Sequence, residues 1–201
     1  MRVSREQAAR NREQVLDAAA RLFRERGFKG VGVAELMQEA GLTHGAFYGQ
    51  FESKEDLMAR AVARAYEQLD ERWRKAAARS PRDPLEGVAA AYLSPLHRDR
   101  PAEGCVIAAL GAEATREGSV LRRTVTEGTE RQLEALTRLV SGPTKQLRRR
   151  RAAATLATMV GALVLARVLD DKALSGEVLR AAREAIRGGH AAPAEEHPDA
   201  R

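Results

Sequence analysis

The sequence is poor in the residues on which several protein classes depend. It has a single cysteine, Cys105, which excludes an internal disulfide and a cysteine-based metal cluster. Aromatic residues make up only 4% of the chain, whereas Ala and Leu abound, and this composition favours helix throughout. We find no run of about 18 apolar residues and no charged-then-apolar leader, so we expect no membrane segment, no export and a cytoplasmic protein.

What the chain does contain fits a folded protein with a charged surface. Hydrophobic residues make up 44% of its 201 residues and charged residues 31%, enough for a packed core and a solvated exterior. That length allows one large domain, or a small domain fused to a mid-sized one. The net charge of +6 and the pI near 10.0 permit a polyanionic partner without proving one.

Residues 33–51 have the pattern of two short helices joined by a glycine turn. Apolar residues recur at spacings of three and four over residues 33–40, and Gly41 then ends the helix. Thr43 is a plausible N-cap for a second helix that buries Phe47 and Phe51. Small and hydrogen-bonding residues on its outer side suit the major groove of DNA. The pattern therefore predicts a helix-turn-helix, although an ordinary helical corner has the same spacing.

The flanking segments make this prediction more specific. Residues 18–28 and 47–57 resemble the DNA-binding domain of TetR family transcriptional regulators, and the resemblance covers roughly residues 10–60. It implies an all-α protein in which a first helix braces the helix-turn-helix in an N-terminal three-helix domain. A C-terminal helical domain would bind an effector and dimerise.

The domain boundaries that we expect follow from this resemblance and from composition. The DNA-binding domain would occupy residues 1–52, and the effector-binding and dimerisation domain residues 53–188. Residues 189–201 are rich in Gly, Ala and Pro and should form a flexible tail.

The family's DNA contacts can be carried over residue by residue. Thr43 and Tyr48 would bind phosphates, and His44 and Gly45 would face base edges. Lys54, in the first turn of the next helix, would touch the DNA backbone, whereas a solvated lysine is the ordinary alternative.

Two positions depart from the family pattern. Gln50 stands where His or Tyr is common, and it could bind a phosphate or an adenine. Gly49 replaces a larger residue, which removes one possible base contact. These departures leave the operator sequence open.

Charge within the expected DNA-binding domain is nearly balanced. Residues 2–60 hold ten basic and nine acidic side chains, so any affinity for DNA must come from where the charges lie. At the start of the chain four arginines outnumber one glutamate, which suits either a DNA-binding arm or a disordered terminus; these are Arg2, Arg5, Arg10 and Arg12.

The helix after the DNA-binding domain should link it to the second domain. A capping box at Ser53 and Asp56 begins this helix, which we expect to run for roughly 25 residues to Ala78. The sequence then predicts a helix from Leu85 through Leu96, a polar loop over residues 97–103, and an apolar helix. The effector-pocket residues that we expect are Tyr66, Trp73, Tyr92, Cys105 and Leu110, and plain core residues are the alternative for all five.

Cys105 lies near the start of that apolar helix, where amide dipoles favour a thiolate that could react with oxidants or electrophiles. A small buried residue that simply packs is the simpler alternative. No base stands in a recognisable pattern with it, so we predict no catalytic residues and no enzyme. The four histidines do not share a metal-ligand spacing, and we expect no metal and no cofactor; they are His44, His97, His190 and His197.

The C-terminal part predicts long helices and a dimer. After a helix over residues 119–140, the basic run 145–151 is either a solvated helix start or a second nucleic-acid patch. Residues 152–170 are apolar on nearly every face, and a twin subunit would cover the side that the chain itself leaves open. The expected interface residues are Leu156, Met159, Val160, Leu163, Val164, Val178 and Leu179.

Together these features predict a ligand-responsive DNA-binding regulator. It would most simply be a repressor that a small molecule, or modification of the thiol, releases from a palindromic operator. A helical scaffold that binds protein partners is the alternative, and a cysteine-dependent enzyme is a more distant one.

Overall fold

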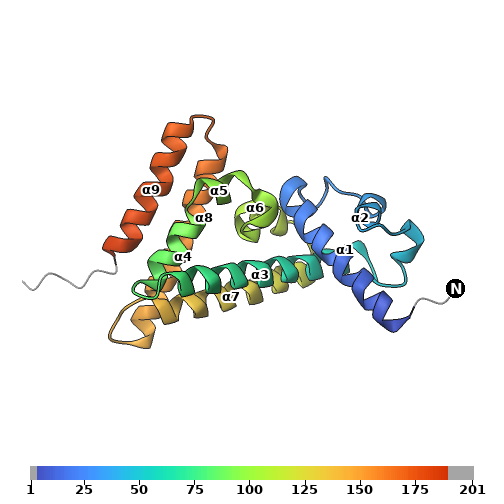
Figure 1. The fold of residues 1–201 in the computed structure, drawn as a ribbon, viewed down its shortest axis with the longest axis horizontal. Helices are drawn as coiled ribbons and strands as arrows, with labels where there is room; N and C mark the ends of the chain where they lie inside the picture. Colours follow the sequence, from blue (N-terminus) through green and yellow to red (C-terminus); the bar gives the residue numbers. More distant parts are fainter. Residues whose placement is uncertain (1–3, 190–201) are drawn as a thin grey trace, which may run out of the picture.

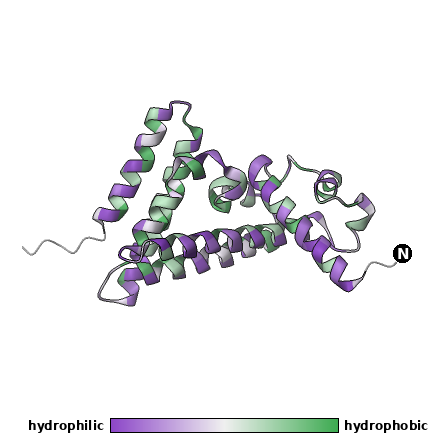
Figure 2. Cartoon of the chain, in the orientation of Figure 1, coloured by the Kyte–Doolittle hydropathy of each residue, from purple (hydrophilic) through white to green (hydrophobic). Residues whose placement is uncertain are grey.

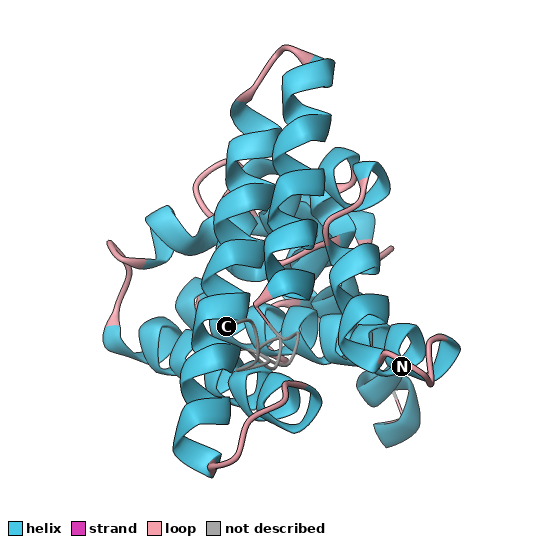
Figure 3. Ribbon diagram, turned by 90° about the vertical axis from the view of Figure 1, so that its left-hand side faces the viewer, coloured by secondary structure: helices cyan, strands magenta, loops and turns pink. Residues whose placement is uncertain are grey.

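The computed structural model describes residues 4–189, and every regular element in that range is a helix, as the all-α prediction required (Figures 1 and 3). In chain order the elements are α1 Arg5–Arg26, α2 Val33–Glu39, the 3-10 helix η1 His44–Ala46, α3 Lys54–Arg79, α4 Pro84–Tyr92, α5 Pro95–Asp99, the 3-10 helix η2 Pro101–Glu103, α6 Val106–Ala114, α7 Ser119–Leu139, α8 Lys145–Val168 and α9 Lys172–Gly188. The expected tail lies almost wholly outside the described residues.

Short polar side chains fix where most of these helices begin. An N-cap oxygen accepts a backbone N–H in six of them; the caps are Ser4, Ser53, Asp83, Ser94, Thr144 and Asp171. At the start of α3 the predicted capping box is present: the Ser53 hydroxyl accepts from the Asp56 N–H at 3.1 Å. The Asp56 carboxylate returns to the N–H of Glu52, at 3.3 Å.

α3 and α7 lie side by side along the length of the molecule and join its two ends (Figure 1). They run in the same direction, because Tyr66 bonds Thr129 at 3.1 Å and Asp70 pairs with Arg131 at 3.7 Å. α1 and α2 lie at the end where α3 begins, and α8 and α9 stand at the other end. Movement of α3 would therefore displace helices at both ends of the molecule.

The apolar core forms two clusters, and the first does not stop at residue 52. It combines the buried faces of α1 and α2 with α3 as far as Tyr66, and also includes Val106 and Leu110 of α6. The second cluster fills the space among α4, α8, α9 and the far part of α3. α6 thus packs directly against the N-terminal helices.

The segment after α4 differs from our prediction. α4 ends at Tyr92 rather than continuing to Leu96, because Pro95 disfavours helix at the residue before it and Ser94 caps a new short helix. Leu96 is consequently 61% exposed. The predicted polar loop is also wrong, since most of residues 97–103 belong to α5 and η2.

Among the described helices, α8 is long and apolar enough to cross a membrane by length and composition alone. A core helix of a soluble protein has the same composition. Here α8 packs against α6, α7 and α9. Apolar residues also lie on the side of α8 that is exposed to solvent (Figure 2).

Candidate nucleic-acid interface and ligand cleft

The segment after α2 exposes polar side chains next to two buried phenylalanine rings. Phe47 and Phe51 are buried, with ring centroids 5.6 Å apart, and they attach the segment to the first core cluster. Tyr48 points outward and is 73% exposed, with its ring against the edges of Phe47 at 5.3 Å and His44 at 5.9 Å. Thr43, His44 and Gly45 are exposed beside it. The structure thus brings together four of the predicted DNA-binding residues.

The conformation of this segment differs from the regular second helix that we expected. Only residues 44–46 are helical, as η1, and turns follow through Gln50. Thr43 occupies the N-cap position, but its side chain makes no capping bond. Gly45 and Gly49 lower helix propensity here, which accounts for the short element.

Two further residues predicted to contact DNA, Lys54 and Gln50, are hydrogen-bonded or buried within the subunit itself. The Lys54 ammonium donates to the carbonyl oxygens of Phe28 at 2.9 Å and Val31 at 2.8 Å, which ties the loop between α1 and α2 to α3. The amide oxygen of Gln50 is buried, with no hydrogen-bond partner in residues 4–189. Contact of either residue with DNA stays a prediction.

Part of the nearly balanced charge of this domain is paired within the domain. Glu35 and Glu39 of α2 pair with Arg26 and Arg21 of α1, so these carboxylates do not stand free on the helix-turn-helix. The predicted basic arm is helical from Arg5 onward, and Arg2 lies outside the described residues.

A cleft of about 350 Å³ lies between α3 and the segment from α4 to η2. Of the five predicted pocket residues, Trp73 and Tyr92 line it. Its lining residues are Leu69, Arg72, Trp73, Lys75, Ala76, Arg79, Ala91, Tyr92, Ser94, Leu96, His97, Arg100 and Glu103.

The other three predicted pocket residues are core instead. Tyr66 lies against Gly128 of α7 so closely that a β-carbon there would overlap its ring, and its hydroxyl bonds Thr129. Leu110 belongs to the first core cluster. Cys105 is 0% exposed and caps the start of α6, so its position near a helix N-terminus is confirmed but its thiol is covered.

His97 connects the cleft to Cys105. Its Nε2 accepts the Cys105 N–H at 3.0 Å, so Nδ1 carries the proton and donates to the Tyr92 carbonyl at 2.7 Å. The ring meets the edge of the Tyr92 ring at 4.5 Å. Burial lowers the pKa of His97 to about 4, which keeps the imidazole neutral. Sequence reasoning placed His97 in a loop and missed this role.

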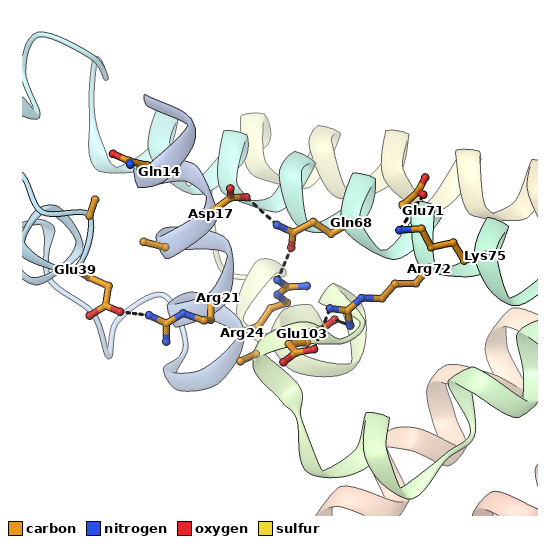
Figure 4. Close-up of a pocket in the computed structure, with 13 residues that line it drawn as sticks. Gln14, Asp17, Arg21, Arg24, Glu39, Gln68, Glu71, Arg72, Lys75 and Glu103 are labelled. Atoms are coloured by element: carbon orange, nitrogen blue, oxygen red, sulfur yellow. Dashed lines mark hydrogen bonds and ion pairs between the residues drawn. The ribbon is translucent and has the colours of Figure 1, made fainter. Parts of the chain in front are cut away.

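A second, more polar cleft of about 730 Å³ lies where α1 meets α3 and η2 (Figure 4). Arg24 stands at its inner side, only 4% exposed, and donates to Gln68 at 2.9 Å and to the carbonyl of Gly104 at 2.9 Å. Gln68 in turn donates to Asp17. Burial, followed by repulsion from Arg72, lowers the pKa of Arg24 to about 10. This arginine ties α1 to the residue before Cys105.

The other end of α6 also reaches the N-terminal domain. Glu113 accepts the backbone N–H of Phe28 at 2.8 Å. Gly27, with φ of 78°, gives the chain the left-handed turn that this contact needs, and a β-carbon there would overlap Glu113. The start of α6 is therefore joined to the cleft through the hydrogen bond between Cys105 and His97, and its far part to the loop before α2 through Glu113.

The predicted dimer interface needs correction. Four of its seven residues lie in the core of the subunit itself and cannot face a partner; these are Leu156, Met159, Leu163 and Leu179. Val160 and Val178 are half-buried against the same core. Val164 is exposed, together with Leu165 at 58% and Val168 at 79%.

Comparison with known proteins identifies the N-terminal domain. Residues 15–61 match the model of bacterial regulatory proteins of the tetR family. The chain is 32% identical over 84 residues to the HTH-type transcriptional regulator AcrR of Shigella flexneri, which covers 42% of this chain and 39% of AcrR. It is 40% identical over 65 residues to the HTH-type transcriptional repressor BepR of Brucella suis, which covers 32% of this chain and 31% of BepR. These matches span two fifths or less of the relatives' lengths.

Solved structures resemble the whole fold. Reduced NemR of E. coli superposes with a TM-score of 0.76 at 24% identity, covering 91% of this chain and 99% of NemR. A TetR transcriptional regulator from Chloroflexus aurantiacus has a TM-score of 0.73 at 25% identity, covering 90% and 96% of the two chains.

The fold and the exposed polar segment define a helix-turn-helix DNA-binding domain attached to a larger helical body. Residues 15–61 match the DNA-binding domain of the tetR family of bacterial regulatory proteins, and the chain as a whole resembles a TetR transcriptional regulator in fold.

Proposed function

We propose that this chain is a cytoplasmic, ligand-responsive transcriptional repressor that binds a palindromic operator as a homodimer. The observation that carries the proposal is the exposed polar surface of the helix-turn-helix, mounted on buried aromatic rings in a domain of this family. Tyr48 and Thr43 bind phosphates, while His44 and Gly45 meet base edges. Lys54 and Gln50 take part once the duplex is bound.

The exposed side of α8 supports the dimer. Its small and apolar residues recur every three or four positions, as expected for one face of a helix; they are Ala157, Gly161, Val164, Leu165 and Val168. A second copy related by two-fold symmetry would cover this face, and the two helix-turn-helix segments would then match the symmetry of a palindrome.

Release from DNA would follow a change in the cleft. A ligand against Tyr92 and His97 would shift Cys105 and the start of α6. α6 passes the change to the N-terminal domain through Glu113 and through the bond between Gly104 and Arg24. A ligand preference of about 100-fold for the released state, near 3 kcal/mol, suffices for clear derepression.

Occupancy of the cleft is a simpler trigger than modification of the thiol. One structural relative, NemR of E. coli, was solved in a reduced form. In the present chain the Cys105 side chain is fully buried, so a reagent reaches it only after the start of α6 opens.

Footprinting of DNA that flanks the protein's own coding sequence tests the proposal. A protected palindrome, with affinity that falls steeply as salt increases, is expected. Tyr48→Ala and Thr43→Ala should each weaken operator binding about ten-fold, because each removes a hydrogen bond to a charged phosphate. Thr126→Ala, an exposed threonine on α7, is the matched control and should bind normally.

The alternatives predict different results. A protein-binding scaffold would keep its partner after Thr43, Tyr48 and Lys54 are all replaced by alanine, and it would protect no DNA. A cysteine-dependent enzyme would lose turnover in Cys105→Ser, yet the imidazole beside that residue, His97, uses its Nε2 to accept the Cys105 backbone N–H.

A further inference from the structure

The ligand cleft combines an aromatic floor with a strongly cationic wall. Trp73 and Tyr92 are buried at its base, with ring centroids 6.1 Å apart. The side chains around them include one carboxylate, that of Glu103, and four cations: Arg72, Lys75, Arg79 and Arg100. His97 adds no charge, because its Nε2 accepts a backbone N–H. The lining residues carry an excess of three positive charges, and pairing of Lys75 with Glu71 at 3.3 Å, a residue outside the lining, leaves an excess of two.

From this lining we propose that the effector is a small organic anion, an aromatic or branched apolar body that carries a carboxylate. The inference rests on the proposed function and specifies the ligand that the cleft would bind. The apolar body would lie on Trp73 and Tyr92, and the carboxylate would meet the arginines. The volume of about 350 Å³ is near the lower end for small-molecule sites, which favours a molecule with one or two rings.

The indole of Trp73 supports an oxygen-bearing ligand. Its Nε1 is buried and has no hydrogen-bond partner in the described part of the chain. An N–H group of this kind can only donate, so it is satisfied by an acceptor such as a carboxylate oxygen. A cationic ligand would instead meet an excess of positive charge.

Arg72 gives the anion a direct route to the switch. Its guanidinium currently binds Glu103 twice, through the backbone carbonyl and through the carboxylate at 3.1 Å. Glu103 precedes Gly104, whose carbonyl accepts from Arg24 of α1. A bound carboxylate competes with Glu103 for Arg72 and thereby loosens η2 where it holds the N-terminal domain.

The test uses three probes that share one phenylpropyl skeleton and differ in charge: 3-phenylpropionate, 3-phenylpropionamide and 3-phenylpropylamine. Trp73 is the chain's one tryptophan, so its fluorescence reports on the cleft without a label. We expect a saturable change with the carboxylate. The amide should bind about ten-fold more weakly or worse, because it loses charge-assisted hydrogen bonds. The amine should bind more weakly still, and calorimetry on the same samples gives each affinity independently.

Substitutions on either side of the ion pair should have opposite effects. Arg72→Gln removes a cation and should weaken 3-phenylpropionate binding about three-fold or more. Glu103→Gln removes the internal competitor and should tighten binding about two- to five-fold, the range expected for an exposed ion pair. Arg150→Gln, an exposed arginine on α8 outside the cleft, makes the same chemical change and should have no effect.

Three outcomes would overturn the anion assignment: equal or tighter binding of the amide or the amine, weaker binding in Glu103→Gln, or no binding of the carboxylate by either measurement. Operator footprinting of the same samples separates this inference from the proposed function. Intact footprints without anion binding refute the ligand class alone, whereas failure to protect any DNA refutes the regulator.

Discussion

At the scale of single residues, His97 makes stability depend on pH. Its pKa is about 4 in the folded chain, against an ordinary value of 6.5, because it is largely buried and needs an unprotonated Nε2. Between these values the unfolded chain binds a proton that the folded chain does not. The free energy of unfolding should therefore fall as the pH drops from about 6.5 to 4, by up to about 3 kcal/mol.

Urea denaturation at a series of pH values measures this effect. His97→Gln keeps an acceptor for the Cys105 N–H but cannot titrate, so its stability should fall less over the same pH range. His44→Gln replaces an exposed histidine and should retain the full pH dependence. If both variants behave like the original protein, His97 is not responsible.

Single residues were also where sequence reasoning reached its limit. The place of Cys105 at a helix start could be predicted, because the apolar run after it is local. The roles of Arg24 and His97 could not: Arg24 binds a carbonyl 80 positions away, and nothing near it in sequence marks it as buried.

At the scale of elements, α6 should control the loop before α2. Glu113→Ala removes the acceptor of the Phe28 N–H and should loosen residues 27–32 while leaving the outward face of the helix-turn-helix unchanged. We expect operator affinity to fall about three- to ten-fold, the cost of one hydrogen bond to a charged group. Amide hydrogen exchange at Phe28 should become faster.

Glu127→Ala, on the exposed side of α7, is the matched control and should change neither quantity. Faster exchange without any loss of operator affinity would mean that this loop does not position the DNA-binding surface.

Most helix limits could be predicted because caps and breakers are local. Ser53, Gly27 and the proline-containing turn after α3 all act within a few residues of the helix ends. The second helix of the helix-turn-helix was predicted too regular, since the glycines at 45 and 49 shorten it. The end of α4 was missed because the apolar spacing continued past Pro95.

At the scale of the whole molecule, the exposed face of α8 should hold the dimer together. Val164→Asp combined with Val168→Asp places two charges in a face that a second copy would bury, and should give monomers with much weaker operator binding. Val120→Asp, an exposed valine on α7, is the control and should remain dimeric. Analytical ultracentrifugation distinguishes the two states, and a persistent dimer would place the interface elsewhere.

The sequence suggested α8 as the dimerisation helix that we propose, but it did not show which side of α8 would face a partner. Residues 152–170 are apolar around the whole helix, so the sequence pattern does not show which side faces the core and which side faces a partner. Which side faces the subunit's core is decided by α6, α7 and α9, and only their packing shows that Met159 and Leu163 lie inside.

The position of α6 has a consequence for how many ligands the proposed repressor would need. Both ends of α6 make their contacts within one subunit, so each protomer carries its own complete switch. A palindrome, however, requires two matching halves. One filled cleft would disturb one half of the dimer, and a dimer with a single ligand would already dissociate from the operator. Derepression would therefore occur at ligand concentrations below those that fill both clefts.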